Sequence, residues 1–316
     1  MKLAVALGWH ALGFEELLDL VRRAESGGFE AVFVDGDVSQ IPSRGEADLL
    51  DGWTVTAALL ARTERIQIGS IRLVHHWNAA RLAQATATLE RIAPGRLRFL
   101  ISIGGQPEDH RFGLPFPSAR DRIAWLDETL WALRRLWRGE EVTARGRFVQ
   151  LSGARIRPCP PAGRLPIEIA AARSQLLQVV ATHADVWDIN LPPIPSRVRT
   201  AEQILADACR RNGRDPAEIR RSMWIFTRPH GDSGKLEIRD EFRRLNPWFR
   251  SLSDDQLGEA IVTGSPEACR RRIAEIAESF QLELPVADLS GLPHDAARHA
   301  IEALASRNTL VDSNSW

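Results

Sequence analysis

Residues 65–100 constrain the fold most, because they predict a strand, a crossover helix and a second strand in succession. The first strand, 66–73, is apolar without a polar stripe, as expected for a parallel strand covered on both faces. The helix after it has apolar residues at helical spacing, and the pair Pro94-Gly95 ends it. A parallel unit of this kind places its functional residues at the carboxyl ends of its strands, here at 73–77 and 104–109.

The same alternation continues along the whole chain. Segments of strand character lie at 3–7, 31–34, 66–73, 97–103, 167–171, 184–190, 222–228 and 286–289. Helical patterns separate them, so the sequence predicts an α/β fold, a TIM (β/α)8 barrel. The alternative is a doubly wound open sheet, which usually has fewer strands and a glycine-rich turn after the first strand. The Gly-Trp-His-Ala sequence at 8–11 lacks that turn.

Two insertions interrupt the expected barrel. Residues 139–165 are rich in Gly and Pro and contain two short strand-like pairs, which predict a hairpin. Residues 230–262 form a long, partly helical insertion. The chain shows no internal repeat, so we expect one barrel domain over 1–316 with a loose tail over 306–316.

The composition is that of a soluble globular enzyme. Of the 316 residues, 44% are hydrophobic and 26% are charged, and 41 basic residues balance 41 acidic ones. This balance gives no overall field for nucleic acid or an anionic membrane. The sequence has no run of about 20 apolar residues for a membrane span and no signal-peptide pattern. Three separated cysteines without metal spacing indicate reduced thiols, so we expect a cytoplasmic protein.

Candidate functional residues follow the first two strands. Trp9 and His10 lie at the carboxyl end of the first strand, where an indole and an imidazole would face the barrel mouth. The alternative is that Trp9 only packs and His10 is a solvated loop residue. Asp35 ends the second strand, where its carboxylate either binds a cofactor or caps a loop.

Two histidines and a tryptophan, His75, His76 and Trp77, follow the third strand. Histidine donates or accepts protons near neutral pH, so both histidines are candidate catalytic residues. Because adjacent residues at a strand end point in opposite directions, we expect at most one of the two to face the pocket. Capping of a backbone group is the alternative. No third ligand stands at metal spacing, so the sequence predicts no metal site.

A glycine pair, Gly104 and Gly105, follows the fourth strand. Two glycines either let the backbone approach a ligand closely or simply form a turn. The loop over 106–111 is polar and rich in titratable groups, so it is a candidate to close over a substrate.

A short junction, residues 171–174, joins the fifth strand to a helix and reads Ala171, Ala172, Arg173 and Ser174. We expect Ser174 to cap this helix. The free N–H groups of the first turn, together with Arg173, predict a phosphate site. An ordinary Ser cap beside a surface Arg is the alternative.

The sixth strand carries Trp187, Asp188 and Asn190. Asp188 on a barrel strand is either a pocket residue or part of a buried ion pair. The ten Trp residues predict an apolar wall for a substrate, although many of them must pack in the core.

Several short motifs occur in a fixed order along nearly the whole chain. They are AESGGFE at 24–30, ARTERIQIG at 61–69, AQATATL at 83–89, PGRL at 94–97, PIEIAA at 166–171, HAD at 183–185 and GSPE at 264–267. Each motif is weak alone, but their order and spacing resemble the bacterial luciferase-like superfamily of flavin and deazaflavin oxidoreductases. The pattern is similar to that of its F-420-dependent glucose-6-phosphate dehydrogenase subgroup.

The resemblance implies a TIM barrel of the luciferase-like type, with a flavin or F-420 ring at the strand ends. It implies a non-proline cis peptide at Ile71-Arg72 that backs the ring, a bond that costs about 3 kcal/mol. It also implies that Asp35 touches the ring or its hydroxyl, and that Asn190 and Asp109 contact cofactor or substrate.

The strand ends and the resemblance together define the expected site. The residues expected at the cofactor are Asp35, Ile71, Arg72, Gly104, Gly105, Gln106, Asp109, Ala171, Ala172, Arg173 and Ser174. The resemblance places the cofactor phosphate at 172–174. The residues expected at the substrate are Trp9, Trp77, Trp187 and Asn190.

The chain departs from the subgroup at its proton-transfer positions. Relatives that oxidise a sugar phosphate carry a His where this chain has Gly36, and a Glu where it has Gln106. Neither replacement transfers a proton, so sugar-dehydrogenase chemistry is not expected. Their phosphate-loop Gly-Gly is Ala172-Arg173 here. The proton must then come from the substrate, from water or from one of three histidines, His10, His75 or His76.

The sequence therefore predicts an F-420-dependent oxidoreductase that transfers a hydride between the deazaflavin and a small organic substrate. A basic groove for the acidic cofactor tail is expected from Arg72, Arg81, Arg111 and Arg173. One alternative is an FMN-dependent monooxygenase supplied with reduced flavin by a separate flavin reductase. Another is a non-catalytic binding protein that has lost the cofactor. The expected partner is a small-molecule substrate, with neither nucleic acid nor membrane, and relatives suggest a homodimer.

Overall fold

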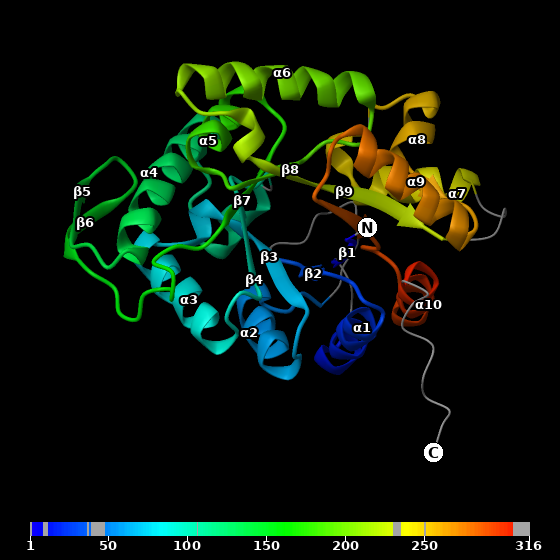
Figure 1. Ribbon diagram of the computed structural model, residues 1–316, viewed down its shortest axis with the longest axis horizontal. Helices are drawn as coiled ribbons and strands as arrows, with labels where there is room; N and C mark the ends of the chain where they lie inside the picture. Colours follow the sequence, from blue (N-terminus) through cyan, green and yellow to red (C-terminus); the bar gives the residue numbers. More distant parts are fainter. Residues whose placement is uncertain are drawn as a thin grey trace.

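The computed structural model describes residues 2–8, 12–36, 38, 48–105, 107–229, 235–249 and 251–305 of the chain. Strands and helices alternate through this part, and helices surround a central set of strands (Figure 1). The tail over 306–316, which the sequence predicts to be loose, lies outside the described residues.

A closed parallel barrel forms the centre of the described structure and confirms the TIM fold. Each strand pairs in parallel with its neighbour in the order β1-β2-β3-β4-β7-β8, and β9 and β11 close the ring back to β1. The strand bounds are β1 Ala4–Leu7, β2 Ala31–Val34, β3 Gln67–Leu73, β4 Leu97–Ser102, β7 Ile167–Ala171, β8 Val186–Ile189, β9 Arg220–Arg228 and β11 Leu284–Asp288. All carboxyl ends therefore lie at one edge.

Helices cover the outside of this barrel (Figure 1). They are α1 Phe14–Ser26, α2 Gly52–Arg62, α3 Ala79–Ile92, α4 Ala119–Trp137, α5 Ser174–His183, α6 Pro195–Arg211, α9 Pro266–Ser279 and α10 His294–Leu304. Several begin at a side-chain cap: Asn78 Oδ1 accepts from the Ala80 and Arg81 N–H groups, and Ser265 Oγ accepts from the Ala268 N–H at the start of α9. No helix in the described ranges is long and apolar enough to cross a membrane.

The first insertion is a two-stranded antiparallel hairpin, as the sequence predicts. Its strands are β5, Val142–Arg145, and β6, Gln150–Ala154. Stacking of Trp125 on Phe148, with ring centroids 5.4 Å apart, fixes the hairpin against α4.

The second insertion is partly helical over its described residues, in agreement with the sequence. It contains α7 Lys235–Leu245, a 3-10 turn η5 at Pro247–Phe249, α8 Asp254–Ala260 and the short strand β10 Val262–Thr263. A small apolar cluster that includes Phe226 and Phe242 packs it onto β9. The fully buried guanidinium of Arg228 donates to Glu241 on α7 at 2.8 Å, so the insertion is tied to the carboxyl end of β9. Further 3-10 turns are η2 Val74–His76, η3 Pro107–Phe112 and η4 Pro216–Glu218.

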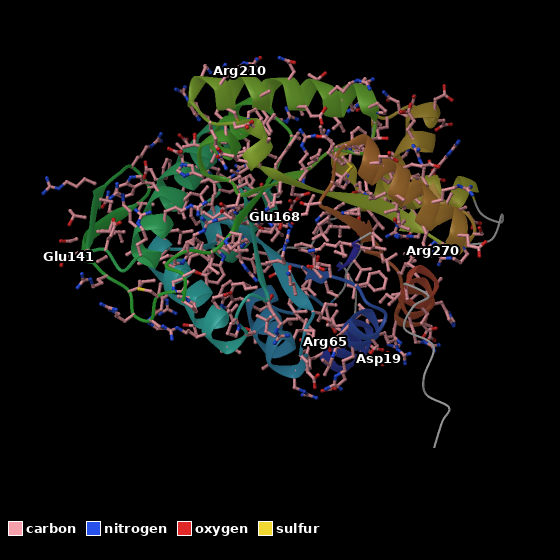
Figure 2. All side chains as sticks on the ribbon, viewed as in Figure 1. Asp19, Arg65, Glu141, Glu168, Arg210 and Arg270 are labelled. Atoms are coloured by element: carbon pink, nitrogen blue, oxygen red, sulfur yellow. The ribbon has the colours of Figure 1, made fainter. Side chains whose placement is uncertain are left out.

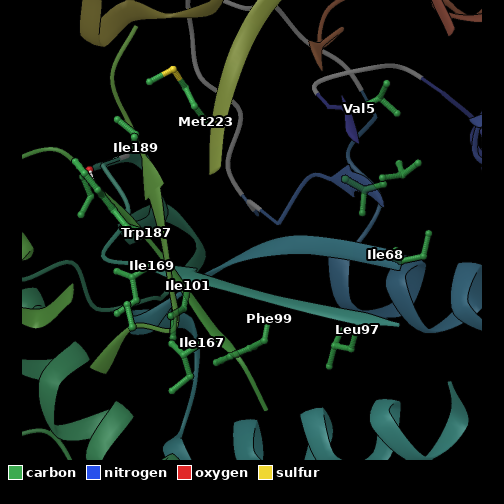
Figure 3. Packing of buried hydrophobic residues seen from close by; sticks show 14 of the residues in the cluster. Val5, Ile68, Leu97, Phe99, Ile101, Ile167, Ile169, Trp187, Ile189 and Met223 are labelled. Carbon is green, nitrogen blue, oxygen red and sulfur yellow. Dashed lines mark hydrogen bonds between the residues drawn. The ribbon is translucent and has the colours of Figure 1, made fainter. Parts of the chain in front are cut away.

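The main apolar core lies between the strands and the helices. Figure 3 shows Val5, Ile68, Phe99, Ile167 and Trp187 among its members. Because outward-facing residues alternate with inward-facing ones, a second cluster of mostly small residues, with Ala4, Ala6, Ala31 and Ala170 among them, fills the inside of the barrel.

The inside of the barrel also holds a buried ionic network. Arg98 on β4 donates to Glu168 on β7 at 2.5 Å, and Ser222 on β9 donates to the other carboxylate oxygen at 2.5 Å. Figure 2 shows Glu168 near the middle of the molecule and Arg65 at its periphery. Asp188 lies opposite Ser222 in the β8–β9 register and is buried in this interior.

The Asp188 carboxyl is buried in this interior, close to the charge of Glu168. Burial, and secondly the charge of Glu168, raise the pKa of Asp188 well above its ordinary value. Its Oδ1 has no hydrogen-bond partner among the described residues. Of the two roles that the sequence leaves open for Asp188, the structure thus favours burial beside an ion pair over contact with a ligand.

The expectation that β3 carries no polar stripe is wrong. Ser70 and Arg72 alternate along it on the face toward α2, where Ser70 Oγ lies 2.9 Å from Thr56 Oγ1. A helix that presents Thr56 and the Gly52 carbonyl to the strand supplies the hydrogen bonds that make this polar face tolerable when buried.

Candidate active site

The carboxyl ends of the parallel strands bring the predicted residues to one rim. Asp35 follows β2, η2 follows β3, and Gly104 and Gly105 follow β4. The junction 171–174 and Asn190 follow β7 and β8. Trp9, His10 and Gln106, which the sequence also places here, lie outside the described residues.

Three glycines pack tightly around the end of β2. A Cβ on Gly36 would lie 1.8 Å from the Ile71 carbonyl oxygen, and one on Gly52 would lie 2.0 Å from the Asp35 carbonyl oxygen. A Cβ on Gly8 would lie 2.4 Å from Asp35 Oδ1. Position 36, where the resemblance implies a His in sugar-phosphate dehydrogenases, therefore has no room for any side chain in this backbone.

The cis peptide expected at Ile71-Arg72 is absent. Within the described ranges the cis bond lies instead at Arg157-Pro158. The reason is visible in β3, which keeps its parallel register with β4 through Leu73, while the Ile71 carbonyl packs on Gly36. An unbroken strand needs no cis bond, which would cost about 3 kcal/mol.

The expectation that Arg72 contributes its charge to a basic groove at the cofactor is wrong. Its guanidinium lies under the Trp53 ring, 4.3 Å from the centroid, and donates to the Gly52 carbonyl at 3.3 Å as well as to Ser70. These partners belong to α2 and β3, on the outer face of the barrel. Burial lowers the pKa of Arg72 to about 9. Of the predicted basic groove, Arg81, Arg111 and Arg173 remain exposed.

The two histidines after β3 do not point in opposite directions, as the sequence predicts for neighbours at a strand end, but converge on one carboxylate. His75 Nε2 and His76 Nε2 lie 2.7 and 2.9 Å from the same oxygen, Asp109 Oδ2. Adjacent rings converge because β3 ends at Leu73 and a 3-10 turn follows, so the alternation of a strand no longer applies. Asp109 comes from η3 after β4, and nothing in the sequence spacing indicates it as the shared partner.

The surroundings of this cluster hold it in place. Gly104, with φ of +68°, passes so close that a Cβ there would lie 2.8 Å from His75 Cε1, which explains a glycine at this rim position. Phe116 packs edge-on against His75, and the Arg122 guanidinium stacks on the Phe116 ring. Burial lowers the pKa of His75, although the hydrogen bond to Asp109 acts to raise it.

The three side chains also have the chemistry of a metal site, since two imidazole nitrogens and a carboxylate oxygen lie within 4.8 Å of one another. Metal binding through Nε2 would move each ring proton to Nδ1. The Nδ1 atom of His75 is buried without a partner among the described residues, and Arg122 places a cation nearby. The surroundings therefore fit shared protons better than a metal ion.

The β7–α5 junction differs in one respect from expectation. Arg173, not Ser174, is the N-cap residue of α5, and its own side chain makes no capping hydrogen bond. Ala171 is buried, whereas Arg173 and Ser174 are exposed. Because the Arg173 side chain does not cap it, the first turn of α5 leaves N–H groups beside an exposed arginine, which is the chemistry of an anion site.

Of the predicted substrate residues within the described ranges, Trp187 does not face the barrel mouth. Trp187 is fully buried in the outer core and donates its indole N–H to the Ala171 carbonyl at 2.9 Å, so the prediction of a substrate contact is wrong. An apolar strand residue next to inward-facing Asp188 must face the helices. Trp77 is half-buried against Trp53, and Asn190 is exposed at the rim.

A closed ring of eight parallel strands covered by helices, with the candidate residues at its carboxyl rim, defines the class of protein: a TIM barrel. More particularly, the chain belongs to the family of luciferase-like monooxygenases, whose pattern matches residues 1–246.

Curated relatives are F420-dependent glucose-6-phosphate dehydrogenases. That of Intrasporangium calvum is 33% identical over 177 residues, 52% of this chain and 52% of the relative. That of Beutenbergia cavernae is 34% identical over 164 residues, 50% of this chain and 47% of the relative. The chain thus matches about half the length of these relatives.

Solved structures match over nearly the whole chain. An F420-dependent secondary alcohol dehydrogenase in complex with an F420-acetone adduct superposes with a TM-score of 0.80, 18% identity and coverage of 96% of this chain and 99% of that one. A monooxygenase from Streptomyces bottropensis superposes with a TM-score of 0.78 and 22% identity, over 96% of this chain and 98% of that one. At these identities the match shows the luciferase-like barrel fold.

Proposed function

We propose that this protein is an F-420-dependent oxidoreductase that moves a hydride between the deazaflavin and a small organic substrate. The observation that carries the proposal is the N-terminus of α5, which the exposed side chain of Arg173 does not cap, at the rim of a barrel of this family. Support also comes from relatives, about one third identical over half their length, that are named F420-dependent.

The residues present fit the cofactor. The amides at the start of α5 and the Arg173 guanidinium supply donors for a phosphate. Exposed Arg81 and Arg111 add positive charge for an acidic tail. Asp35 stands at the end of β2, where a carboxylate accepts a hydrogen bond from the ring system.

The bound deazaflavin would supply the hydride acceptor or donor, and the chain would supply orientation. Asn190, exposed after β8, offers an amide for a substrate polar group. The substrate is not expected to be a sugar phosphate, because Gly36 leaves no room for the histidine of those dehydrogenases.

A second candidate is an FMN-dependent monooxygenase that receives reduced flavin from a separate reductase. Gly36 has no side chain that could transfer a proton. This favours a monooxygenase, because such an enzyme does not need the proton transfer that oxidation of a sugar phosphate requires. Oxygen consumption with reduced FMN and a panel of substrates distinguishes this candidate from the first.

Titration of the purified protein with F-420 and with FMN, followed by cofactor fluorescence, tests the proposal. We expect saturable binding of F-420, weakened about tenfold or more by Arg173→Gln, since one charge-assisted contact is worth at least about 1.4 kcal/mol. Arg65→Gln is the matched control, because exposed Arg65 precedes β3 at the opposite end of the barrel and should leave affinity unchanged. Tight FMN binding without F-420 binding would overturn the proposal, and binding of neither would indicate a non-catalytic protein.

A further inference from the structure

Two imidazoles share one buried carboxylate oxygen at the rim between β3 and β4. His75 and Asp109 have fully buried side chains, and His76 is the partly open member with 10% of its side chain exposed. The two rings meet nearly edge to face, with centroids 4.4 Å apart. This arrangement fixes where protons are held.

The positions of the ring protons follow from which atoms can donate and which can accept a hydrogen bond. An ionised carboxylate only accepts hydrogen bonds, so both Nε2 atoms must donate an N–H to Asp109 Oδ2. Each imidazole then carries its lone pair on Nδ1. Arg122, anchored on the carbonyls of Ile103 and Gly104, lies close enough to offset the charge of Asp109.

The two Nδ1 atoms are not equivalent. His75 Nδ1 is buried and without a partner among the described residues, so a proton added there would be neither hydrated nor hydrogen-bonded. His76 has no such buried, unpartnered atom. An extra proton therefore enters and leaves the cluster at His76, where the Nε2–H bond to Asp109 stabilises the imidazolium.

We propose that His76 is the catalytic acid–base residue of this protein, with Asp109 fixing its Nε2–H tautomer and His75 holding Asp109 in place. The inference rests on the proposed oxidoreductase function and names its substrate class: a secondary or primary alcohol, or the carbonyl compound formed from it. In alcohol oxidation a bound deazaflavin would accept the hydride that leaves the carbon with the electron pair of the broken C–H bond. The O–H proton passes to His76 Nδ1, and a C=O bond forms. Reduction runs the same step backwards.

With His76 in this role, the proton-transfer group follows β3, whereas the resemblance implies one after β2. Gly36 cannot carry one, because the Ile71 carbonyl fills its side-chain position. The turn η2 follows the next strand along, so its histidines reach the same rim. His75 and Asp109 are positioning residues in this scheme, and His76 alone contacts the substrate.

Nuclear magnetic resonance of histidine nitrogens in the whole protein tests the proton inventory without any cofactor. The signals that disappear in His76→Gln identify His76 in the spectrum of the wild-type protein. In the wild type we expect these signals to show a protonated Nε2 and an unprotonated Nδ1. Asp109→Asn should abolish this preference for one tautomer. An Nδ1–H tautomer for His76 would overturn the proposal. So would one equivalent of tightly bound Zn²⁺ that His76→Gln loses, because the cluster would then be a metal site.

Turnover with F-420 and a panel of alcohols and ketones tests the catalytic role. His76→Gln should lower kcat by about 10²- to 10⁴-fold and abolish the pH dependence of kcat, with F-420 affinity unchanged. His183→Gln is the matched control, because His183 also bonds a carboxylate, that of Asp127 at 2.8 Å, at the amino end of the barrel. It should leave both quantities unchanged.

The two proposals fail in different ways. Full turnover and an unchanged pH profile in His76→Gln would overturn the role of His76 while leaving the oxidoreductase function intact. If the wild-type protein binds no F-420, the function itself fails. The nitrogen signals then still report whether His75 and His76 share Asp109.

Discussion

The carbonyl oxygen of Ile71 and the α-carbon of Gly36 are packed so closely that no side chain fits between them, since a Cβ on Gly36 would lie 1.8 Å from that oxygen. The position of the Ile71 carbonyl, at the trans peptide bond that follows Ile71, therefore requires a glycine at position 36. Because of it, position 36 at this barrel rim carries no side chain.

Gly36→Ala should destabilise the protein by about 1–3 kcal/mol, since the added methyl group meets a backbone carbonyl that can move only with β3. Urea unfolding measures the change. Gly258→Ala is the matched control, because a Cβ at Gly258, inside α8, meets nothing within 4 Å and should stabilise by about 0.5–1 kcal/mol. Equal midpoints for wild type and Gly36→Ala would contradict the packing.

The barrel could be predicted from the sequence because its signals are local. Each expected strand is a short apolar run between a helix and a turn, and capping residues such as Asn78 and Ser265 mark helix starts by themselves. What side chains contact across the barrel is not local. Asp109 lies 34 residues from His75, and only the folded register of β3 and β4 brings them together.

The errors in the expected site have a common cause. The sequence places Arg72 and Trp187 at the site, but the two-residue period of a strand directs their side chains outward, toward the helices. The inward-facing neighbours, Ile71 and Asp188, are those that line the barrel interior. Facing direction depends on the register of each strand, which one sequence does not give.

Arg72→Met should retain stability within about 1 kcal/mol, because a linear apolar side chain replaces a buried cation that has no carboxylate among its hydrogen-bond partners. Arg72→Ala should cost about 2–4 kcal/mol through the cavity left under Trp53. Urea unfolding of both variants measures these values. F-420 affinity should stay unchanged in Arg72→Met, and a loss of affinity there would place the guanidinium at the cofactor after all.

His75 should make stability depend on pH. Burial lowers the pKa of folded His75 below its ordinary 6.5, so below that pH the unfolded chain binds a proton that the folded chain refuses. Stability is therefore retained above pH 6.5 and is lost as the pH falls below it, by up to about 1.4 kcal/mol per pH unit.

Unfolding free energies between pH 5 and pH 8 check this, where His75→Gln should flatten the slope while keeping a donor for Asp109. The charged groups that act on His75 are Asp109, His76 and Arg122, and none of them is altered in this variant. Since His183→Gln should preserve the wild-type slope, parallel curves for wild type and His75→Gln would show that His75 is not the group responsible.

Asp188→Asn should stabilise the protein at neutral pH. Because burial raises the pKa of folded Asp188 well above 3.8, the folded chain holds a proton that the unfolded chain releases, and stability falls as the pH rises above 3.8. An isosteric amide has no proton to release, so the advantage of the variant should grow from pH 4 to pH 7 in urea unfolding. Glu168→Gln is the contrasting control: it leaves Arg98 buried without its ionised partner and should cost about 3–5 kcal/mol. A constant difference between Asp188→Asn and wild type across this pH range would mean that Asp188 is ionised in the fold.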